Sequence, residues 1–372
     1  MRIFTVQSSG VSENASFDAQ SALPLPEHAY RWIACSRTEF GNRQGEIQSI
    51  LQAVCGMQLV DLHISDLLNT HIPSHYDYTS QYDILVFRRL AAETGKRRSI
   101  HNPEALKTRA HKGPTILNRI DTSPVGFAVF ENLLLTVHPE NCSVLDTYAA
   151  KLFSAAMPET RAPGAHLPVD PADLMLRLVN QMVDGFLELR RELTHQLDYW
   201  QSELLNPKSQ FNHWGALLDA RLTLHYLDEI CEDQRSAIQD WIEAIKTWPD
   251  AATPQLHRER DLLKVRSRDV LEHIERVVHH VRRLEQSAET AVQMHFNAQG
   301  HRTNDIMRTL TALTAIFMPL NLIAAIFGMN FEFLPLIHLH QGFWWTMGLM
   351  LVIALALGVI FWRKRYLART GR

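Results

Sequence analysis

Hydrophobic residues are unevenly distributed along this chain, and the two longest apolar runs, residues 310–327 and 342–362, both lie near its C-terminal end. Each run is close to the roughly 20 apolar residues that a helix needs to cross the hydrocarbon core of a bilayer. A polar stretch that begins with Gly328-Met329-Asn330 separates them. We therefore predict two transmembrane helices, over 304–327 and 342–362, joined by a loop over 328–341.

Residues 1–170 show the shorter patterns of a mixed α/β domain. Runs of apolar, β-branched and aromatic residues predict strands at 30–35 and 83–87. Two more strands are expected within 125–137, separated at Glu131-Asn132 as in a hairpin. The apolar residues of 46–54 recur at helical spacing, which predicts a helix there.

Two segments of this first part carry no such pattern. Residues 88–118 are basic and irregular, so we expect a loop. Prolines recur over 157–171, which indicates a linker or a helix boundary.

From residue 171 onward the pattern is helical. Amphipathic spacing predicts helices over 173–205 and 211–248, and the short break between them favours an antiparallel pair. Thr253-Pro254 then supplies an N-cap and a first-turn proline. Helical spacing continues from Pro254 to Phe327, which predicts one helix about 110 Å long at 1.5 Å per residue. Such a helix must pack on other helices or on copies of itself.

A polar stripe, which we call the seam, follows this long helix in alternating steps of three and four residues. Within the first span it consists of Asn304, Met307, Thr311, Thr314, Met318, Asn321 and Ala325. Before the span it consists of Asp269, Glu272, Arg276, His279, Arg283, Gln286, Thr290, Gln293, Asn297 and Gly300. Polar groups in a span normally face a bundle interior or a water-filled cavity. The period of 3.5 residues favours supercoiled helices around a hydrated axis.

Alternatives to a pore remain open at this point. The soluble part of the seam fits a solvated helix face equally well, and Thr311 and Thr314 are able to hydrogen-bond to their own backbone. A membrane-anchored scaffold protein would need no polar stripe in its span, so the seam argues against that class. The chain shows no catalytic constellation and no phosphate-binding loop, so we expect neither an enzyme nor an organic cofactor.

Charge predicts the orientation of the spans. Arg308 precedes the first apolar run and Arg363-Lys364-Arg365 follows the second, whereas 328–341 contains no Lys or Arg. The positive-inside rule then places both termini, including a basic tail over 363–372, in the cytoplasm. A net charge of −3 does not suggest nucleic acid as a partner. The four scattered cysteines form no Cys-x-x-Cys pair, so no zinc ribbon or disulfide framework is indicated.

The stretch Ile-Phe-Gly-Met-Asn-Phe-Glu-Phe at 326–333 resembles the signature of the CorA family of divalent-cation transport proteins, as do 304–311 and 316–320. The resemblance is close over 304–367 and thinner upstream. It implies an α+β fold with a cytoplasmic α/β/α domain over 1–170 and long helices over 171–303 that include a stalk. It also implies a homopentameric channel in the inner (plasma) membrane, with a pore-lining first span and a peripheral second span.

The resemblance assigns roles within the channel. Gly328-Met329-Asn330 matches the selectivity motif, and its Asn meets the hydrated ion at the outer mouth. Met307, Leu310 and Met318 match apolar constrictions, and Asn304 matches a polar ring at the inner end of the span.

The resemblance also implies a regulatory metal site. Asp269, in Arg268-Asp269-Val270, matches a stalk residue that binds a regulatory cation between subunits. From the residues alone, a surface carboxylate paired with Arg266 or Arg268 is the favoured interpretation of Asp269.

Some positions depart from the family pattern. Asn321 replaces a common Thr and Ala325 a common Gly, and the loop has Leu336 where the family has a carboxylate. Cation capture then depends more on Asn330 and Glu332. The resemblance implies a protein that takes up Mg²⁺ and whose substrates extend to Co²⁺ or Ni²⁺. It also implies that Mg²⁺ is both the transported ion and the regulatory ion. A zinc transporter on the same scaffold is the open alternative.

Overall fold

The computed structural model describes residues 1–7, 10–14, 29–90, 121–156, 166–205, 214–249, 253–329 and 341–363. The chain divides into two compact units, Met1–Glu289 and Thr290–Arg372.

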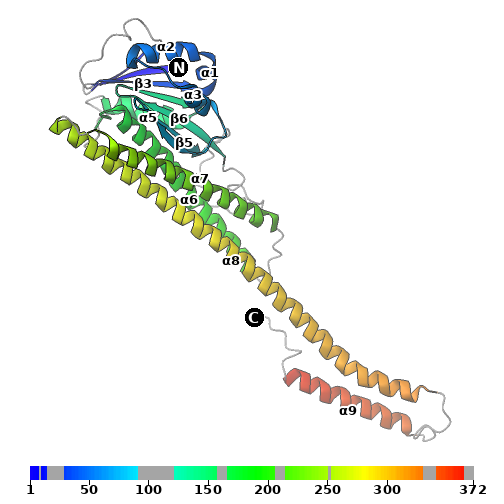
Figure 1. Ribbon diagram of the computed structural model, residues 1–372. Coiled ribbons are helices and arrows are strands. Elements are labelled where there is room, and N and C mark those ends of the chain that lie inside the picture. The colour runs from blue at the N-terminus through cyan, green and yellow to red at the C-terminus, as the bar shows by residue number, and fades with distance from the viewer. Residues whose placement is uncertain are drawn as a thin grey trace. The chain divides into compact units, whose positions relative to one another are not determined.

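A seven-stranded mixed sheet is the centre of the first unit, with the strand order β2-β1-β3-β7-β6-β5-β4 (Figure 1). The strands are β1 (Arg2–Gln7), β2 (Gly10–Asn14), β3 (Tyr30–Ser36), β4 (His75–Tyr78), β5 (Asp83–Leu90), β6 (Thr122–Val129) and β7 (Leu133–His138). β3 and β7 pair in parallel, and the other neighbouring strands pair antiparallel. The central strands are buried almost continuously rather than alternately, because helices cover both faces of the sheet.

One face of the sheet is covered by α1 (Arg37–Asn42), α2 (Gln44–Cys55) and α3 (Asp61–Leu68). A capping box starts α1: Ser36 Oγ accepts from the Glu39 N–H at 3.2 Å, and the Ser36 N–H donates to Glu39 Oε2 at 2.9 Å. α3 approaches β6 very closely at Gly126, where a Cβ atom would lie 2.2 Å from Leu67 Cδ2. Any larger residue at that position requires a shift of the Leu67 side chain or of α3.

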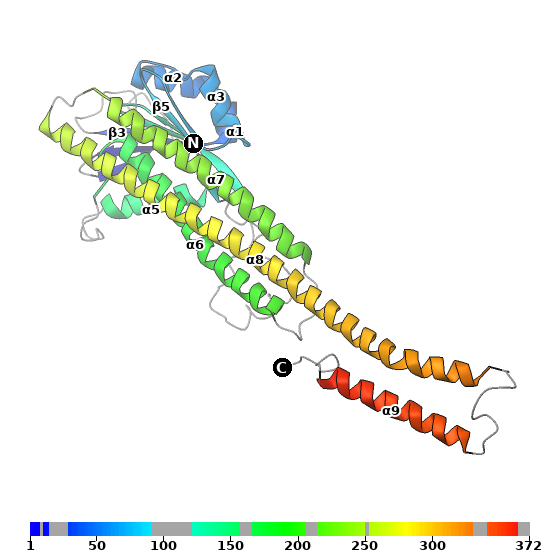
Figure 2. The same cartoon turned by 60° about the horizontal axis from the view of Figure 1, so that its bottom comes forward.

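The opposite face carries α5 (Ser143–Ala156), α6 (Pro171–Leu205) and α7 (Trp214–Thr247). α8 (Pro254–Phe327) begins in this unit and runs beside α6 and α7, as Figures 1 and 2 both show. Polar contacts fix its register: Trp241 Nε1 of α7 donates to Ser267 Oγ at 3.1 Å, and Gln201 Nε2 of α6 donates to Ser287 Oγ at 2.5 Å.

The predicted elements of the first unit are present in the structure. The strands expected at 30–35, 83–87 and within 125–137 appear as β3, β5, β6 and β7, and the helix expected at 46–54 is α2. The loop predicted from residue 88 is wrong for 88–90, which extend β5. The buried Arg88 and Arg89 guanidiniums are accommodated there by carbonyls, including Ile72 O at 2.8 Å from Arg88 Nη1. The rest of the predicted loop lies outside the described residues.

The second unit contains the last part of α8 and α9 (Gly342–Arg363). Both helices are long and apolar enough to cross a membrane, and only 6% of the most apolar window of α8 and 0% of that of α9 are buried. Figures 1 and 2 both show α9, in red, alongside the final turns of α8, in orange.

Candidate functional site

The seam of the second unit lies on an exposed face of α8. Met307 is 60% exposed and Met318 72% exposed, and Asn304, Leu310, Thr311, Thr314, Asn321 and Ala325 are exposed too. The less exposed positions of this part of α8 are Ala312, Ala315, Ile316, Pro319, Leu320, Ile323 and Phe327. With 3.6 residues per turn, the centre of that second set lies about 160° around the helix from the seam. The seam is thus opposite the side of α8 that is partly covered within its unit.

The threonine hydroxyls of the seam are already engaged as donors. Thr311 Oγ1 donates to the Met307 carbonyl at 2.8 Å, and Thr314 Oγ1 donates to the Leu310 carbonyl at 2.9 Å. The backbone bonding expected as an alternative is therefore present. This backbone bonding still leaves the threonine oxygens available to the seam, because a hydroxyl that donates its proton keeps lone pairs that can accept a hydrogen bond. Thr311 Oγ1 and Thr314 Oγ1 therefore keep lone pairs on this face that are able to accept.

α8 ends where the predicted outer motif begins. The Gly328 N–H donates to the Ala324 carbonyl at 2.9 Å, and the Met329 N–H donates to the Ile326 carbonyl at 3.3 Å. Both Gly328 and Met329 are exposed. Asn330 and Glu332, together with the rest of the predicted loop up to residue 340, lie outside the described residues.

In the first unit the seam is exposed as well. Each of its members from Asp269 to Gln286 is exposed, whereas the buried positions of α8 over the same stretch are Val270, Ile274, Val277, Val278, Val281 and Leu284. These apolar residues face the helical layer of α6 and α7, which leaves the seam on the outer side. Glu272 and Arg276 form an ion pair along it at 2.5 Å.

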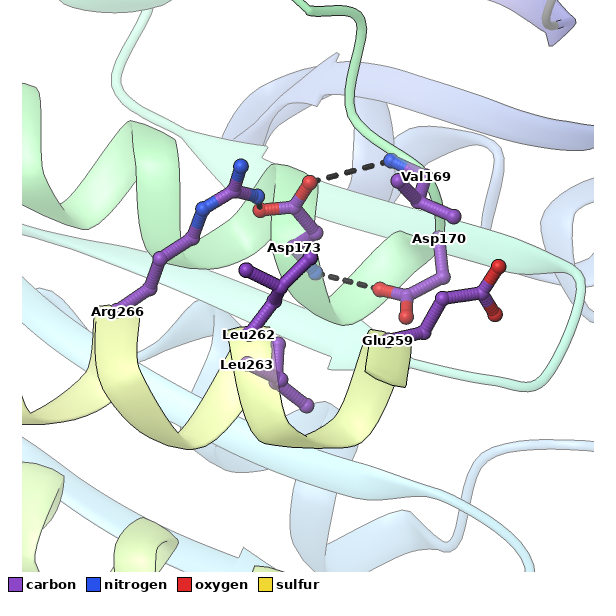
Figure 3. Close-up of a pocket in the computed structure, with 7 residues that line it drawn as sticks. All are labelled: Val169, Asp170, Asp173, Glu259, Leu262, Leu263 and Arg266. Carbon is purple, nitrogen blue, oxygen red and sulfur yellow. Dashed lines mark hydrogen bonds and ion pairs between the residues drawn. The ribbon is translucent and has the colours of Figure 1, made fainter. Parts of the chain in front are cut away.

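Asp269 does not pair with Arg266. Arg266 forms an ion pair with Asp173 of α6 instead (Figure 3). The Asp173 carboxylate is 4% exposed and also accepts from the Val169 N–H at 3.1 Å and from Arg177 Nε at 3.2 Å. A buried carboxylate needs such partners far more than an exposed one does, so Asp173 takes the guanidinium. Asp269 is 59% exposed and lies 3.8 Å from His273 Nε2.

Figure 3 also shows Asp170 and Glu259 side by side in a small pocket between the start of α6 and the start of α8. Asp170 Oδ1 accepts from the Asp173 N–H at 2.6 Å and so caps α6. Burial, and secondarily the charge of Glu259, raises the pKa of Asp170 from 3.8 to about 6. No group of three or more His, Cys, Asp or Glu side chains able to hold a metal ion occurs among the residues the structure describes.

Sequence reasoning missed His273 and Asn180. His273 Nδ1 lies 3.1 Å from Asn180 Oδ1 on α6, while its Nε2 faces Asp269. The spacing of four between Asp269 and His273 was a visible signal, since residues four apart share a helix face. The contribution of Asn180 depends on how α6 packs against α8.

An α/β unit followed by two helices long and apolar enough to cross a membrane, the last part of α8 and α9, is the architecture expected of a membrane protein with a large extramembrane domain. Residues 32–365 match the family described as CorA-like Mg²⁺ transporter protein, and the chain belongs to this family.

Several relatives share most of this length. The cobalt/magnesium transport protein CorA of Thermotoga maritima is 21% identical over 355 residues, covering 94% of this chain and 87% of that protein. The magnesium transport protein CorA of Haemophilus influenzae is 31% identical over 255 residues, covering 67% of this chain and 74% of that protein. The complete structure of the CorA magnesium transporter from Methanocaldococcus jannaschii has a TM-score of 0.69 at 17% identity, covering 100% of this chain and 98% of that chain, which confirms the fold.

Proposed function

We propose that this chain is a membrane channel for divalent cations, with Mg²⁺ as its main substrate, and that the seam of α8 lines the conduit. The observation that carries the proposal is the exposed seam on the side of α8 opposite its partly covered face. In a bilayer, Asn304, Thr314 and Asn321 require polar surroundings, which copies of the same seam and enclosed water supply. Relatives named magnesium and cobalt transport proteins support the ion class.

The assembly we propose is a homopentamer in the inner membrane, with α9 at the periphery and both termini in the cytoplasm. The number five follows from the family resemblance. The orientation follows from the basic residues that flank the spans and from the loop without Lys or Arg.

The proposed route begins at a ring of Asn330 amides beside Glu332. Mg²⁺ gives up its water reluctantly, so an amide ring that binds the hydrated ion avoids the cost of stripping it. Met318, Leu310 and Met307 then narrow the conduit toward Asn304. The water of a hydrated cation points its hydrogens outward, which suits the acceptor oxygens of Thr311 and Thr314. An inside-negative potential contributes about 2.3 kcal/mol per charge per 100 mV, hence about twice that for a divalent ion.

Asp269 is proposed to hold a regulatory cation between neighbouring copies. Its carboxylate is 59% exposed on the outer face of α8, so a cation has access to it. Within the described part of one chain it belongs to no three-group cluster, so the site takes further ligands from water or a second copy. A cation bridging these carboxylates would stabilise the closed ring, and its loss would shift the population toward the open state.

Ion flux into proteoliposomes tests the channel. We expect Mg²⁺ influx into vesicles that contain the wild-type chain, and loss of most of that influx in Asn330→Ala. Thr346→Val is a control, because Thr346 lies on α9 and its hydroxyl donates to the Gly342 carbonyl at 3.0 Å. Equal influx in Asn330→Ala and wild type would show that Asn330 does not select the transported ion. Influx of Zn²⁺ in place of Mg²⁺ would favour the zinc transporter, and no influx of Mg²⁺, Co²⁺, Ni²⁺ or Zn²⁺ would contradict the function.

Inhibition of the same flux by internal Mg²⁺ tests the regulatory site. We expect Asp269→Lys to weaken this inhibition, because the positively charged lysine side chain repels the cation from the site. Asp261→Lys is the matched control, since Asp261 is a carboxylate on α8 outside the seam and its side chain is 73% exposed. Unchanged inhibition of influx by internal Mg²⁺ in Asp269→Lys would show that Asp269 is not part of the regulatory site.

A further inference from the structure

His273 holds an unusual position next to Asp269. It lies one helical turn further along α8, and its Nε2 atom is 3.8 Å from Asp269 Oδ1. Its other ring nitrogen, Nδ1, is 3.1 Å from Asn180 Oδ1 on α6. The His273 side chain is 21% exposed and that of Asp269 is 59% exposed, so the gap between them opens to solvent.

The contact with Asn180 determines which nitrogen carries the proton. A carbonyl-type oxygen only accepts, so His273 Nδ1 is the donor in this contact. A neutral imidazole then has its lone pair on Nε2, which faces the Asp269 carboxylate. Two acceptors that face each other repel unless a proton or a metal ion lies between them.

The ligand set indicates which metal ion fits. An imidazole nitrogen together with a carboxylate oxygen suits Zn²⁺, Co²⁺ and Ni²⁺, whereas Mg²⁺ prefers oxygen ligands alone. In a tetrahedral site with bonds of 2.0–2.1 Å, the two ligand atoms lie about 3.4 Å apart. The observed 3.8 Å therefore needs only a small side-chain movement. An outer hydrogen bond such as the one to Asn180 is the usual means of orienting a ligating histidine.

We propose that Asp269 and His273 form a binding pair for a transition-metal dication, with Asn180 as the positioning residue. This inference rests on the proposed function, because it gives the regulatory site at Asp269 a preference for Co²⁺, Ni²⁺ or Zn²⁺ over Mg²⁺. Water or a second copy supplies the remaining ligands.

Metal binding to the purified full-length protein in detergent tests the pair without any transport measurement. Co²⁺ is titrated and followed by its visible absorption, and Mg²⁺ binding is measured by calorimetry. We expect His273→Gln to weaken Co²⁺ binding by at least about tenfold while Mg²⁺ binding stays unchanged, and Asn180→Ala to weaken Co²⁺ binding by about tenfold. His257→Gln, which changes an exposed histidine of α8 outside the seam, should leave Co²⁺ binding at the wild-type level.

Two results would overturn the inference. One is equal Co²⁺ affinity in His273→Gln and wild type, which would leave His273 and Asp269 as a simple ion pair. The other is a parallel loss of Co²⁺ and Mg²⁺ affinity in a variant with the wild-type melting temperature and oligomeric size.

Failure of this inference is distinguishable from failure of the proposed function. If His273→Gln loses Co²⁺ while Asp269→Lys keeps normal inhibition by Mg²⁺, the metal pair stands and the regulatory role falls. If Asp269→Lys abolishes inhibition while His273→Gln binds Co²⁺ normally, the regulatory role stands and the metal pair falls.

Discussion

Three aspartates, Asp170, Asp173 and Asp269, lie in different surroundings although they are the same type of residue. Asp173 is buried and receives an arginine and a backbone N–H, which makes it a structural anchor between α6 and α8. Asp170, three residues earlier, is half-buried beside another carboxylate. Asp269 is exposed, and a histidine faces it. Sequence alone places Asp173 and Asp269 on helices and Asp170 in the proline-rich stretch before them, so it could not assign these separate environments.

Asp170 should make the stability of the protein depend on pH. Its pKa is about 6 in the folded chain against an ordinary value of 3.8, so folding favours its protonated form. The stabilisation is fully present below the ordinary pKa and is lost as pH rises through about 6, with an upper limit of about 3 kcal/mol. Asn caps a helix equally well, so Asp170→Asn should remove this part of the pH dependence.

Thermal unfolding of the full-length protein in detergent, near pH 5 and near pH 7.5, measures this effect. The melting temperature of Asp170→Asn should exceed that of wild type near pH 7.5 and approach it near pH 5. Asp61→Asn, which changes an exposed residue in the first turn of α3, serves as the control. An identical pH response in Asp170→Asn and wild type would contradict the prediction.

At the scale of elements, local signals predicted the long helices well. Both ends of α8 agree with the sequence, because Thr253 Oγ1 accepts from the Leu256 N–H at 3.2 Å and Gly328 follows the last turn. β4 was missed, since its sequence His-Tyr-Asp-Tyr lacks an apolar alternation and it forms by pairing with β5. The seam was found from spacing alone, whereas the link from Asn180 to His273 required the packing of two helices.

The packing of α3 on β6 gives a prediction at this scale. Gly126→Ala places a Cβ 2.2 Å from Leu67 Cδ2, so α3 or the side chain must shift. We expect the free energy of unfolding to fall by about 1–3 kcal/mol. Thermal unfolding of the full-length protein should show a lower melting temperature.

Two further variants identify the cause. Gly126→Ala combined with Leu67→Ala should be less destabilised than the sum of the two single changes, because the clash is shared. Gly45→Ala, in α2, has nothing within 4 Å of its new Cβ and should not lower the melting temperature. Additive effects in the double variant would exclude the steric explanation.

At the scale of the whole molecule, the seam is exposed in both units, and a single chain suggests no function for it. In the proposed assembly, the seam would face a common axis between neighbouring copies. Asn297 and Gln299 are both exposed on α8, but only Asn297 belongs to the seam. About 200° of helix rotation separates them.

Cross-linking tests that arrangement. In a background without the four native cysteines, Asn297→Cys should join copies of the chain through a short bifunctional maleimide, and Gln299→Cys should not. Denaturing gel electrophoresis of the membrane-embedded protein measures the products. Equal cross-linking of the two variants would show that the seam does not face a common axis.

The period of the seam has a mechanical consequence. From Asn304 to Ala325 the seam advances by three steps of seven residues, and a straight α-helix drifts by about 20° per step, so the stripe turns by about 60° around α8. Copies that keep this stripe on one axis must coil around it with a left-handed twist. In the proposed conduit, the width would then be coupled to the twist of the helices, because a small change in twist would turn amide and methionine side chains toward or away from the axis.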